Sequence, residues 1–147
     1  AGLTPNPCIQ CNRHLKFSYF LDAALQMGYD AIATGHYAQI RQDPETGRYL
    51  LCKAADKAKD QTYFLYTLTQ EQLRCTRFPL GKLTKAEARA IAESKGFINA
   101  KKRDSQDICF IPDGDYVRFL TEYRGKAPAE GDYVDVDGNV LGRHLGQ

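Results

Sequence analysis

Three cysteines carry the clearest chemical signal in this chain. Cys8 and Cys11 form a Cys-x-x-Cys pair near the start, and Cys109 lies far along the sequence. A close thiol pair with a distant third thiol can transfer sulfur, hold a metal or cluster, or form a disulfide. The other two cysteines, Cys52 and Cys75, have apolar or isolated surroundings and are interpreted as packing residues.

The surroundings of the pair favour reactivity over simple packing. Cys11 directly precedes a predicted helix for which Asn12 is a good N-cap. Cationic or ionisable residues follow it at Arg13, His14 and Lys16. Helix N-terminal amides and nearby cations stabilise a thiolate, so we hypothesise a lowered pKa for Cys11. Cys8 is expected in a proline-held loop close to the same spot, and the alternative is two ordinary loop thiols.

The same residues allow two kinds of metal site. Cys8, Cys11, His14 and Cys109 have the ligand types of a Cys₃His zinc site. An Asn12 cap would place His14 in the first helical turn, where its ring need not face Cys8. Three cysteines without a fourth ligand instead suit an iron-sulfur cluster with one open iron, by extension from four-thiolate sites.

The elements that position these residues predict an α/β architecture. We expect helices, strands and hairpins in this order: a helix over 12–28, a short buried strand over 30–35, a hairpin of 37–40 and 49–52, a helix over 61–73, an extended segment over 76–80, helices over 84–96 and 115–122, and a hairpin of 133–136 and 140–141. Ligands in such sheets bind beyond the carboxyl ends of the strands, which makes Gly35 and His36 candidates. Lys57 and Lys59 could meet phosphate at the entrance of the helix over 61–73, although a charged helix entrance is the simpler interpretation.

Composition narrows the class of protein. The chain has 147 residues, enough for one domain, or for one domain and part of another. A net charge of +2 lies below that of a dedicated nucleic-acid module, so RNA contact would depend on local clusters. No segment has the length of a membrane span, and five irregularly spaced cysteines favour a reduced, cytoplasmic setting. The start without Met and the abrupt end are expected of a piece of a longer protein.

Four ordered motifs together resemble the tRNA-specific 2-thiouridylase family. They are Thr4-Pro5-Asn6-Pro7 with Cys11-Asn12 and Lys16-Phe17, then Ala33-Thr34-Gly35-His36-Tyr37, Lys59-Asp60-Gln61-Thr62-Tyr63-Phe64-Leu65, and Ser105-Gln106-Asp107-Ile108-Cys109-Phe110-Ile111. The resemblance implies a fold and a domain division. Residues 1–124 would be the C-terminal part of an adenine-nucleotide alpha-hydrolase-like (PP-loop) Rossmann-like domain. Residues 125–147 would begin a smaller, β-rich central domain, with a boundary as early as about residue 113.

The resemblance also implies an activity. The family adenylates the 2-oxygen of the wobble uridine 34 in tRNA with ATP, as its Mg²⁺ complex, and replaces that oxygen with sulfur from a cysteine desulfurase or sulfur-relay protein. Cys11 would be the nucleophile and Cys109 the persulfide carrier. The other implied contacts are ATP at Gly35, tRNA at His36, Lys59, Asp60 and Gln61, and the target base at Asn6, Pro7 and Cys8.

Two departures from the family pattern leave alternatives open. The Ser-Gly-Gly-Val-Asp-Ser phosphate loop is absent, so these residues alone should not adenylate a substrate. Many members also have Asp where this chain has Cys8. Related thiolases hold a [4Fe-4S] cluster with three cysteines, so a cluster at Cys8, Cys11 and Cys109 competes with persulfide chemistry. A different class of protein, a zinc-stabilised RNA-binding module with structural thiols, is the alternative to an enzyme.

Overall fold

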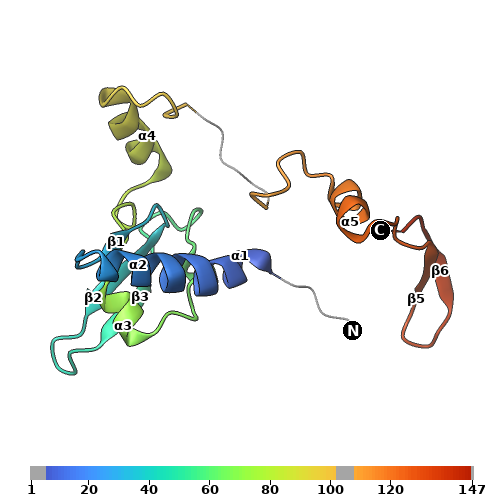
Figure 1. The fold of residues 1–147 in the computed structure, drawn as a ribbon, viewed down its shortest axis with the longest axis horizontal. Coiled ribbons are helices and arrows are strands. Elements are labelled where there is room, and N and C mark those ends of the chain that lie inside the picture. Colours follow the sequence, from blue (N-terminus) through green and yellow to red (C-terminus); the bar gives the residue numbers. More distant parts are fainter. Residues whose placement is uncertain (1–5, 102–107, 147) are drawn as a thin grey trace. The chain divides into compact units, whose positions relative to one another are not determined.

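The computed structural model describes residues 6–101 and 108–146, which fall into two compact units, Ala1–Arg103 and Asp104–Gln147 (Figure 1). We describe each unit by itself. The predicted domain division at residues 124 and 125 stays a prediction. Residues 105–107 of the predicted motif Ser105 to Ile111, and Thr4 and Pro5 of the first motif, lie outside the described residues.

The first unit opens with one continuous helix that begins earlier than predicted. It consists of α1 (Pro7–Gln10), η1 (Cys11–Phe20), which has π-helical hydrogen bonding, and α2 (Leu21–Gln26). The side chain of Asn6 caps it by accepting hydrogen bonds from the N–H groups of Cys8 and Ile9 at 3.1 and 3.3 Å. Pro7 occupies the first helical position, where its missing N–H costs nothing. The prediction of Asn12 as the N-cap is therefore wrong, whereas Gly28, with φ of 86°, follows the helix end as expected.

The central strands are short and run parallel. β1 (Ile32–Ala33) pairs with β4 (Thr76–Arg77), and the pairing continues into a bond from the N–H of Thr34 to the carbonyl of Arg77 at 3.1 Å. The predicted strand over 30–35 is thus reduced to two residues, but its direction places Gly35 and His36 beyond its carboxyl end. The predicted extended segment over 76–80 is likewise limited to β4.

An antiparallel hairpin lies between β1 and β4 in the sequence. β2 (Ala38–Gln42) and β3 (Tyr49–Lys53) pair in the register Ile40 opposite Leu51. Asp43 closes the turn by accepting hydrogen bonds from the N–H groups of Glu45 and Thr46. The hairpin prediction is confirmed.

The prediction of one helix over 61–73 is wrong. The segment contains a 3₁₀ turn, η2 (Thr62–Phe64), and then a separate helix, α3 (Gln70–Arg74). Thr69 starts α3 with a capping box, in which its hydroxyl accepts from the N–H of Gln72 and its own N–H donates to the Gln72 side chain. A cap at this position ends any helix arriving from Gln61, so two short elements replace one long helix.

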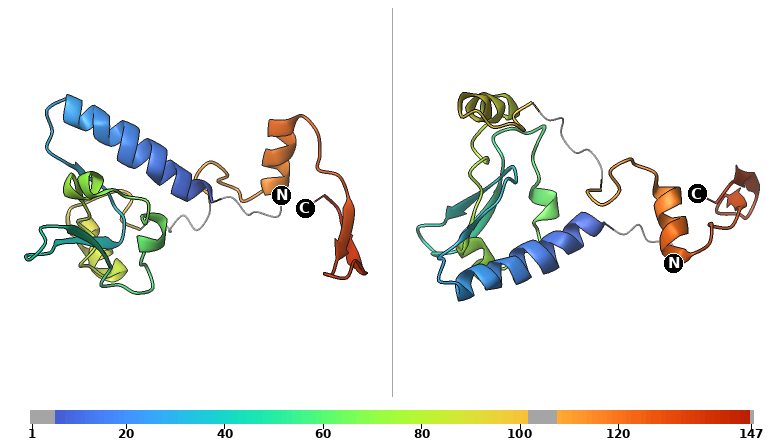
Figure 2. Two further views of the ribbon diagram at one scale, coloured as in Figure 1. Left: turned by 90° about the horizontal axis from the view of Figure 1, so that it is seen from below. Right: turned by 45° about the horizontal axis from the view of Figure 1, so that its top comes forward.

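The later elements follow the sequence pattern closely. Thr84 and Glu87 form the predicted capping box at the start of α4 (Lys85–Ser94), and Asp115 caps α5 (Tyr116–Arg124). β5 (Gly131–Val134) and β6 (Val140–His144) form the hairpin of the second unit, whose first strand begins and ends two residues earlier than the predicted 133–136. Figure 2 shows these elements in two further views.

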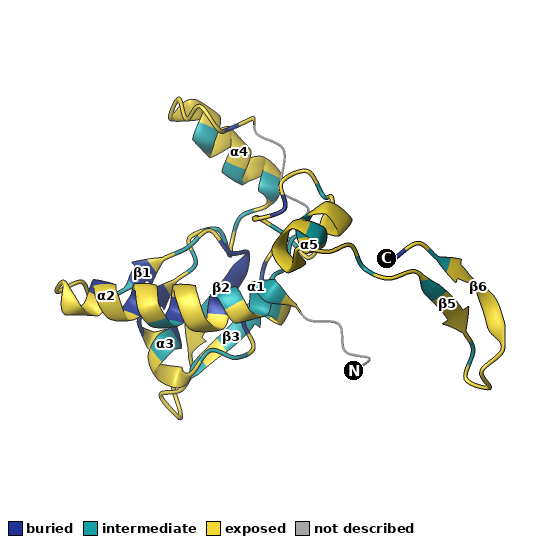
Figure 3. Cartoon of the chain, turned by 45° about the vertical axis from the view of Figure 1, so that its right-hand side comes forward, coloured by how far each residue is buried: buried dark blue, intermediate teal, exposed yellow. Residues whose placement is uncertain are grey.

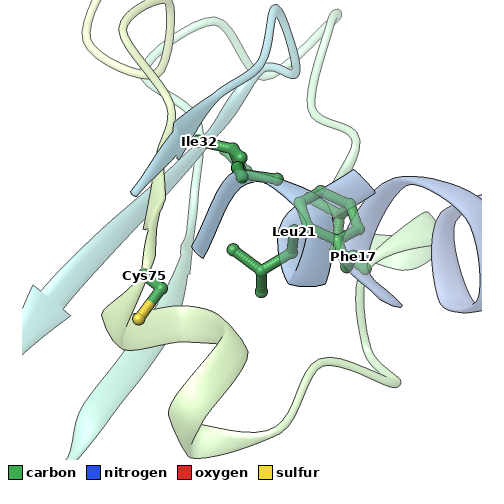
Figure 4. Packing of buried hydrophobic residues seen from close by; sticks show 7 residues of the cluster. Phe17, Leu21, Ile32 and Cys75 are labelled. Carbon is green, nitrogen blue, oxygen red and sulfur yellow. The ribbon is translucent and has the colours of Figure 1, made fainter. Parts of the chain in front are cut away.

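The core of the first unit lies where the long helix meets the strands. Phe17 and Leu21 on the helix, Ile32 on β1 and Cys75 at the end of α3 are at most 4 % exposed and pack in one cluster (Figure 4). The opposite side of the helix is exposed, as Figure 3 shows. Cys75 is thus a packing residue, as predicted.

Gly81 fixes the hairpin to the turn that follows β4. A Cβ atom at this position would overlap the carbonyl oxygen of Ala38 on β2. The carbonyl of Gly81 also accepts a hydrogen bond of 2.9 Å from the N–H of Ala55. Only glycine allows the two backbone segments to approach this closely.

Candidate functional site

The two cysteines of the Cys-x-x-Cys pair lie on the first turns of the long helix. Cys8 is in the first turn, and Cys11 follows three residues later at the junction of α1 and η1. Residues three apart on a helix are neighbours on one face, so the structure brings both half-buried thiols to the same side. The expectation that Cys8 lies in a loop and Cys11 at the helix start is corrected, because Asn6 rather than Asn12 is the cap.

Asn12 is a buried polar residue, which the sequence interpretation missed. Its side chain is only 4 % exposed, and its Oδ1 atom has no hydrogen-bond partner among the described residues. A buried acceptor without a partner is costly, so such an atom calls for an explanation. An asparagine directly after Cys11 is as compatible with a polar site as with a cap, so the sequence alone does not distinguish the two.

His36 is the most constrained polar residue of the site. Its ring lies beyond the carboxyl end of β1, is 8 % exposed, and packs near Phe17 and Phe78 at centroid distances of 5.8 and 5.9 Å. Nδ1 lies 2.8 Å from the hydroxyl of Thr34, and Nε2 lies 3.4 Å from Nζ of Lys16. Because an ammonium group only donates, Nε2 accepts from Lys16, and the ring proton on Nδ1 is donated to Thr34.

These surroundings keep the imidazole uncharged. Burial, assisted by the positive charge of Lys16, lowers the pKa of His36 from 6.5 to about 4. His36 is therefore neutral at pH 7 and accepts the hydrogen bond from Lys16 without electrostatic repulsion between the two side chains. The implied contact of His36 with tRNA stays a prediction, and in the structure both ring nitrogens are already occupied.

We expect the stability of the first unit to fall as the pH is lowered from about 6.5 to about 4. In the unfolded chain His36 takes up a proton near its ordinary pKa, whereas in the folded chain it does so only near 4. The unfolded state then binds more protons, so stability decreases as the pH falls, by up to about 3 kcal/mol at 1.36 kcal/mol per pKa unit. Urea unfolding followed by tyrosine circular dichroism at several pH values measures it.

The matched control for this prediction is His36→Gln, which cannot titrate in this range. The difference in unfolding free energy between the two proteins should shrink as the pH falls. A direct NMR titration of the His36 ring checks the cause independently of the variant's stability. A midpoint near the ordinary value would contradict the prediction.

Gly35 lies exposed between Thr34 and His36, directly after β1. A Cβ atom added there would meet only Cδ1 of Leu80, at an ordinary 3.8 Å. The backbone at Gly35 is thus open to a ligand, as expected beyond the carboxyl end of a parallel strand. Its contact with ATP stays a prediction.

Asp60 and Gln61 make hydrogen bonds that join the loop after β3 to the backbone next to β2 and β3. Asp60 accepts hydrogen bonds from the N–H of Ala54 at 2.8 Å and the hydroxyl of Thr62 at 2.6 Å. Burial acts to raise the pKa of Asp60, but these hydrogen bonds outweigh it and lower the pKa. Gln61 exchanges two hydrogen bonds with the backbone of Tyr37, of 3.0 and 2.9 Å. Both side chains therefore hold the loop that presents Lys59, and tRNA contacts at the three residues stay predictions.

Cys109 belongs to the second unit. Its side chain is exposed on the turn that precedes α5, next to Phe110, whose ring packs 5.4 Å from that of Phe119. All five cysteines fall in the described ranges, and their thiols are free. Because the two units are described separately, the pairing of Cys109 with Cys11 stays a prediction.

The described residues contain no preformed group of metal ligands. Among residues 6–101 and 108–146, no three His, Cys, Asp or Glu side chains are grouped as metal ligands. His14 instead hydrogen-bonds the Gln10 side chain at 3.1 Å.

Among residues 6–101 and 108–146, none of the helices is long and apolar enough to cross a bilayer.

Comparison with known proteins places these residues in a family context. A family model described as "tRNA methyl transferase HUP domain" matches residues 1–113. The chain is 57% identical over 145 residues to the tRNA-specific 2-thiouridylase MnmA of Geotalea uraniireducens. It is 53% identical over 146 residues to the protein of the same name from Lachnoclostridium phytofermentans, and 52% identical over 147 residues to that from Treponema denticola. Each match covers 99% of this chain but only 38%, 41% and 40% of the respective relative.

Proposed function

Because the chain belongs to the tRNA methyl transferase HUP domain family, we propose that it is part of a tRNA uridine 2-sulfurtransferase. The membership also identifies its α/β architecture as the Rossmann-like HUP fold that was predicted. The observation that carries the proposal is the identity of 57% along nearly the whole chain to a protein named tRNA-specific 2-thiouridylase. Since the chain spans about two fifths of such relatives, the activity requires segments beyond these 147 residues.

The proposed reaction has two parts. ATP, as its Mg²⁺ complex, adenylates the 2-oxygen of uridine 34 and releases pyrophosphate. The outer sulfur of a persulfide on Cys109, supplied by a cysteine desulfurase or sulfur-relay protein, then forms a bond to C2, and AMP leaves with the oxygen. The Cys11 thiolate attacks the inner sulfur of Cys109, the sulfur-sulfur bond breaks, and its electron pair stays with the sulfur on C2. The Cys11–Cys109 disulfide that results takes two electrons from a thiol reductant before the next cycle.

The structure supports parts of this proposal. Cys11 lies on the long helix with Cys8 on the same face, and Gly35 exposes its backbone beyond the carboxyl end of β1. The phosphate loop that would cradle pyrophosphate is absent from the 147 residues. These residues alone are therefore expected to be inactive. We propose the cytoplasm as the location of the enzyme, because its proposed substrate is tRNA.

A cluster mechanism remains the competing version of the same function. Cys8 and Cys11 share one helix face, so two of three thiolate ligands for a [4Fe-4S] cluster are already side by side. A bound cluster would hold sulfide on its open iron. The chain's own residues would then keep two thiolates oriented and leave Cys109 as the third ligand.

We expect a full-length protein that contains these residues to form 2-thiouridine in tRNA only when ATP and a sulfur donor are both present. The assay incubates anaerobically purified protein with unmodified tRNA, digests the RNA and detects the nucleoside by mass spectrometry. Omission of ATP is the control, since adenylation must precede sulfur transfer. Product formed equally well without ATP, or no product with every component present, would overturn the proposal.

A further inference from the structure

Lys16 is an exposed cation whose position is fixed by a buried partner. It lies on η1, and its Nζ atom donates a hydrogen bond of 3.4 Å to Nε2 of His36. His36 is itself fixed by Thr34 at 2.8 Å and by the rings of Phe17 and Phe78. A lysine side chain loses considerable rotamer freedom when it is held in this way, so the arrangement has an entropic cost.

The partner of Lys16 is neutral, and this determines what the lysine can do. A carboxylate in the place of His36 would cancel the ammonium charge, whereas a neutral imidazole leaves it uncompensated. Among the described residues, Lys16 makes no ion pair with a carboxylate. One of its three N–H donors is used, so two remain for a ligand. The result is an oriented full positive charge.

The position of this charge coincides with the candidate site. His36 and the open backbone of Gly35 both follow the carboxyl end of β1. Lys16 is five residues beyond Cys11 within η1, whose hydrogen bonds join residues five apart, so the two residues lie on the same side of the helix. The ammonium group is therefore presented on the cysteine side of the helix and at the ligand edge of the strands.

We propose that Lys16 is a phosphate-binding residue of this site, and that His36 and Thr34 are positioning residues that act through it. This inference rests on the proposed function for the identity of the ligand. Lysine is a common point-charge ligand for phosphate. The phosphate belongs either to the nucleotide or to the RNA backbone, which present the same chemistry to an ammonium group.

The test measures two affinities of the full-length protein separately. ATP binding is measured without RNA, and binding of unmodified tRNA is measured without ATP at salt concentrations between about 50 and 200 mM. The variants are Lys16→Gln, Lys16→Arg and His36→Gln, and Lys95→Gln serves as the control for loss of an exposed lysine elsewhere. We expect Lys16→Gln to weaken one ligand about tenfold, and Lys16→Arg to restore most of that loss.

The pattern of loss identifies the ligand. A loss confined to ATP identifies a nucleotide phosphate, and a loss confined to tRNA, with a salt slope smaller by about 1, identifies an RNA phosphate. His36→Gln should weaken the same ligand, and combining it with Lys16→Gln should add little, because both variants disturb one interaction. The proposal is overturned if Lys16→Gln leaves both affinities unchanged, or weakens both and Lys16→Arg restores neither. A wild-type protein that binds these ligands but forms no 2-thiouridine would contradict the proposed function alone.

Discussion

A full-length protein with Cys11→Ala is expected to form no more than about a thousandth of the 2-thiouridine that the unchanged protein forms. In the proposed reaction this thiolate breaks the sulfur-sulfur bond, and no other described side chain on that helix face except Cys8 offers the same chemistry. Loss of a nucleophile that reacts directly with substrate is among the largest single-residue effects known in enzymes. The measurement is the rate of 2-thiouridine formation under single-turnover conditions.

The matched control is Cys52→Ala, which removes a thiol from β3 outside the candidate site. Its rate should stay close to that of the unchanged protein. Cys109→Ala should lose activity as completely as Cys11→Ala, but only Cys11→Ala should retain a persulfide detectable by mass spectrometry. Full activity of the Cys11→Ala protein would remove that thiol from the mechanism.

Cys8 distinguishes the two versions of the mechanism. Cys8→Asp restores the residue that many family members have, so persulfide chemistry should survive this change. A cluster would lose one of its three ligands, and both iron and activity should fall together. Iron and acid-labile sulfide measured in anaerobic preparations of the unchanged and Cys8→Asp proteins decide between them.

The second large effect is expected at Gly81. Gly81→Ala should destabilise the first unit by about 3 kcal/mol or more, because the new Cβ atom meets backbone rather than a flexible side chain. Relief requires β2 and the turn after β4 to move apart, which would also break the bond from Ala55 to Gly81. Urea unfolding at pH 7 measures the loss.

Gly35→Ala is the matched control for this prediction. Its added Cβ atom makes one ordinary contact with Leu80, so the unfolding free energy should change little. If Gly35 also borders ATP, the same substitution should weaken nucleotide binding in the full-length protein while the fold is unchanged. Equal destabilisation by the two substitutions would show that the close approach at Gly81 does not determine the stability of this unit.

Local chemistry made some elements predictable from the sequence. Thr84 and Glu87 form a capping box that needs no tertiary contact, and the Asp137-Gly138-Asn139 turn defines the last hairpin. The strand before Gly35 was also found, because an apolar run followed by a glycine marks it, although β1 covers only two of the six predicted residues. In each case the determining residues are neighbours in the sequence.

The errors arose where several local signals competed. Asn6 and Asn12 are both acceptable caps, and Pro7 at the first helical position favours Asn6. Between Gln61 and Leu73, the aromatic and leucine residues follow a pattern that is typical of a helix. The side chains of Asp60 and Gln61 instead accept hydrogen bonds from the N–H groups of Ala54 and Tyr37. Thr69 then caps a new helix. Such distant partners are not readable from spacing.

The candidate site shows the same division. The reactive residue types and the motif around His36 were found in the sequence, but the connection from Thr34 through His36 to Lys16 required the fold. The unpartnered Oδ1 of Asn12 could not be found either, because burial of a polar atom depends on packing.

Because the helix begins at Pro7, helix geometry fixes the spacing between Cys8 and Cys11. On a helix each residue advances the direction of the side chain by about 100°, so the two thiols keep a fixed phase as well as a fixed distance. Inserting a single residue between them would rotate Cys8 about a quarter turn around the axis, whereas the same insertion in a loop could be absorbed. The Cys-x-x-Cys spacing in this protein therefore sets both the distance and the relative direction of the two thiol side chains.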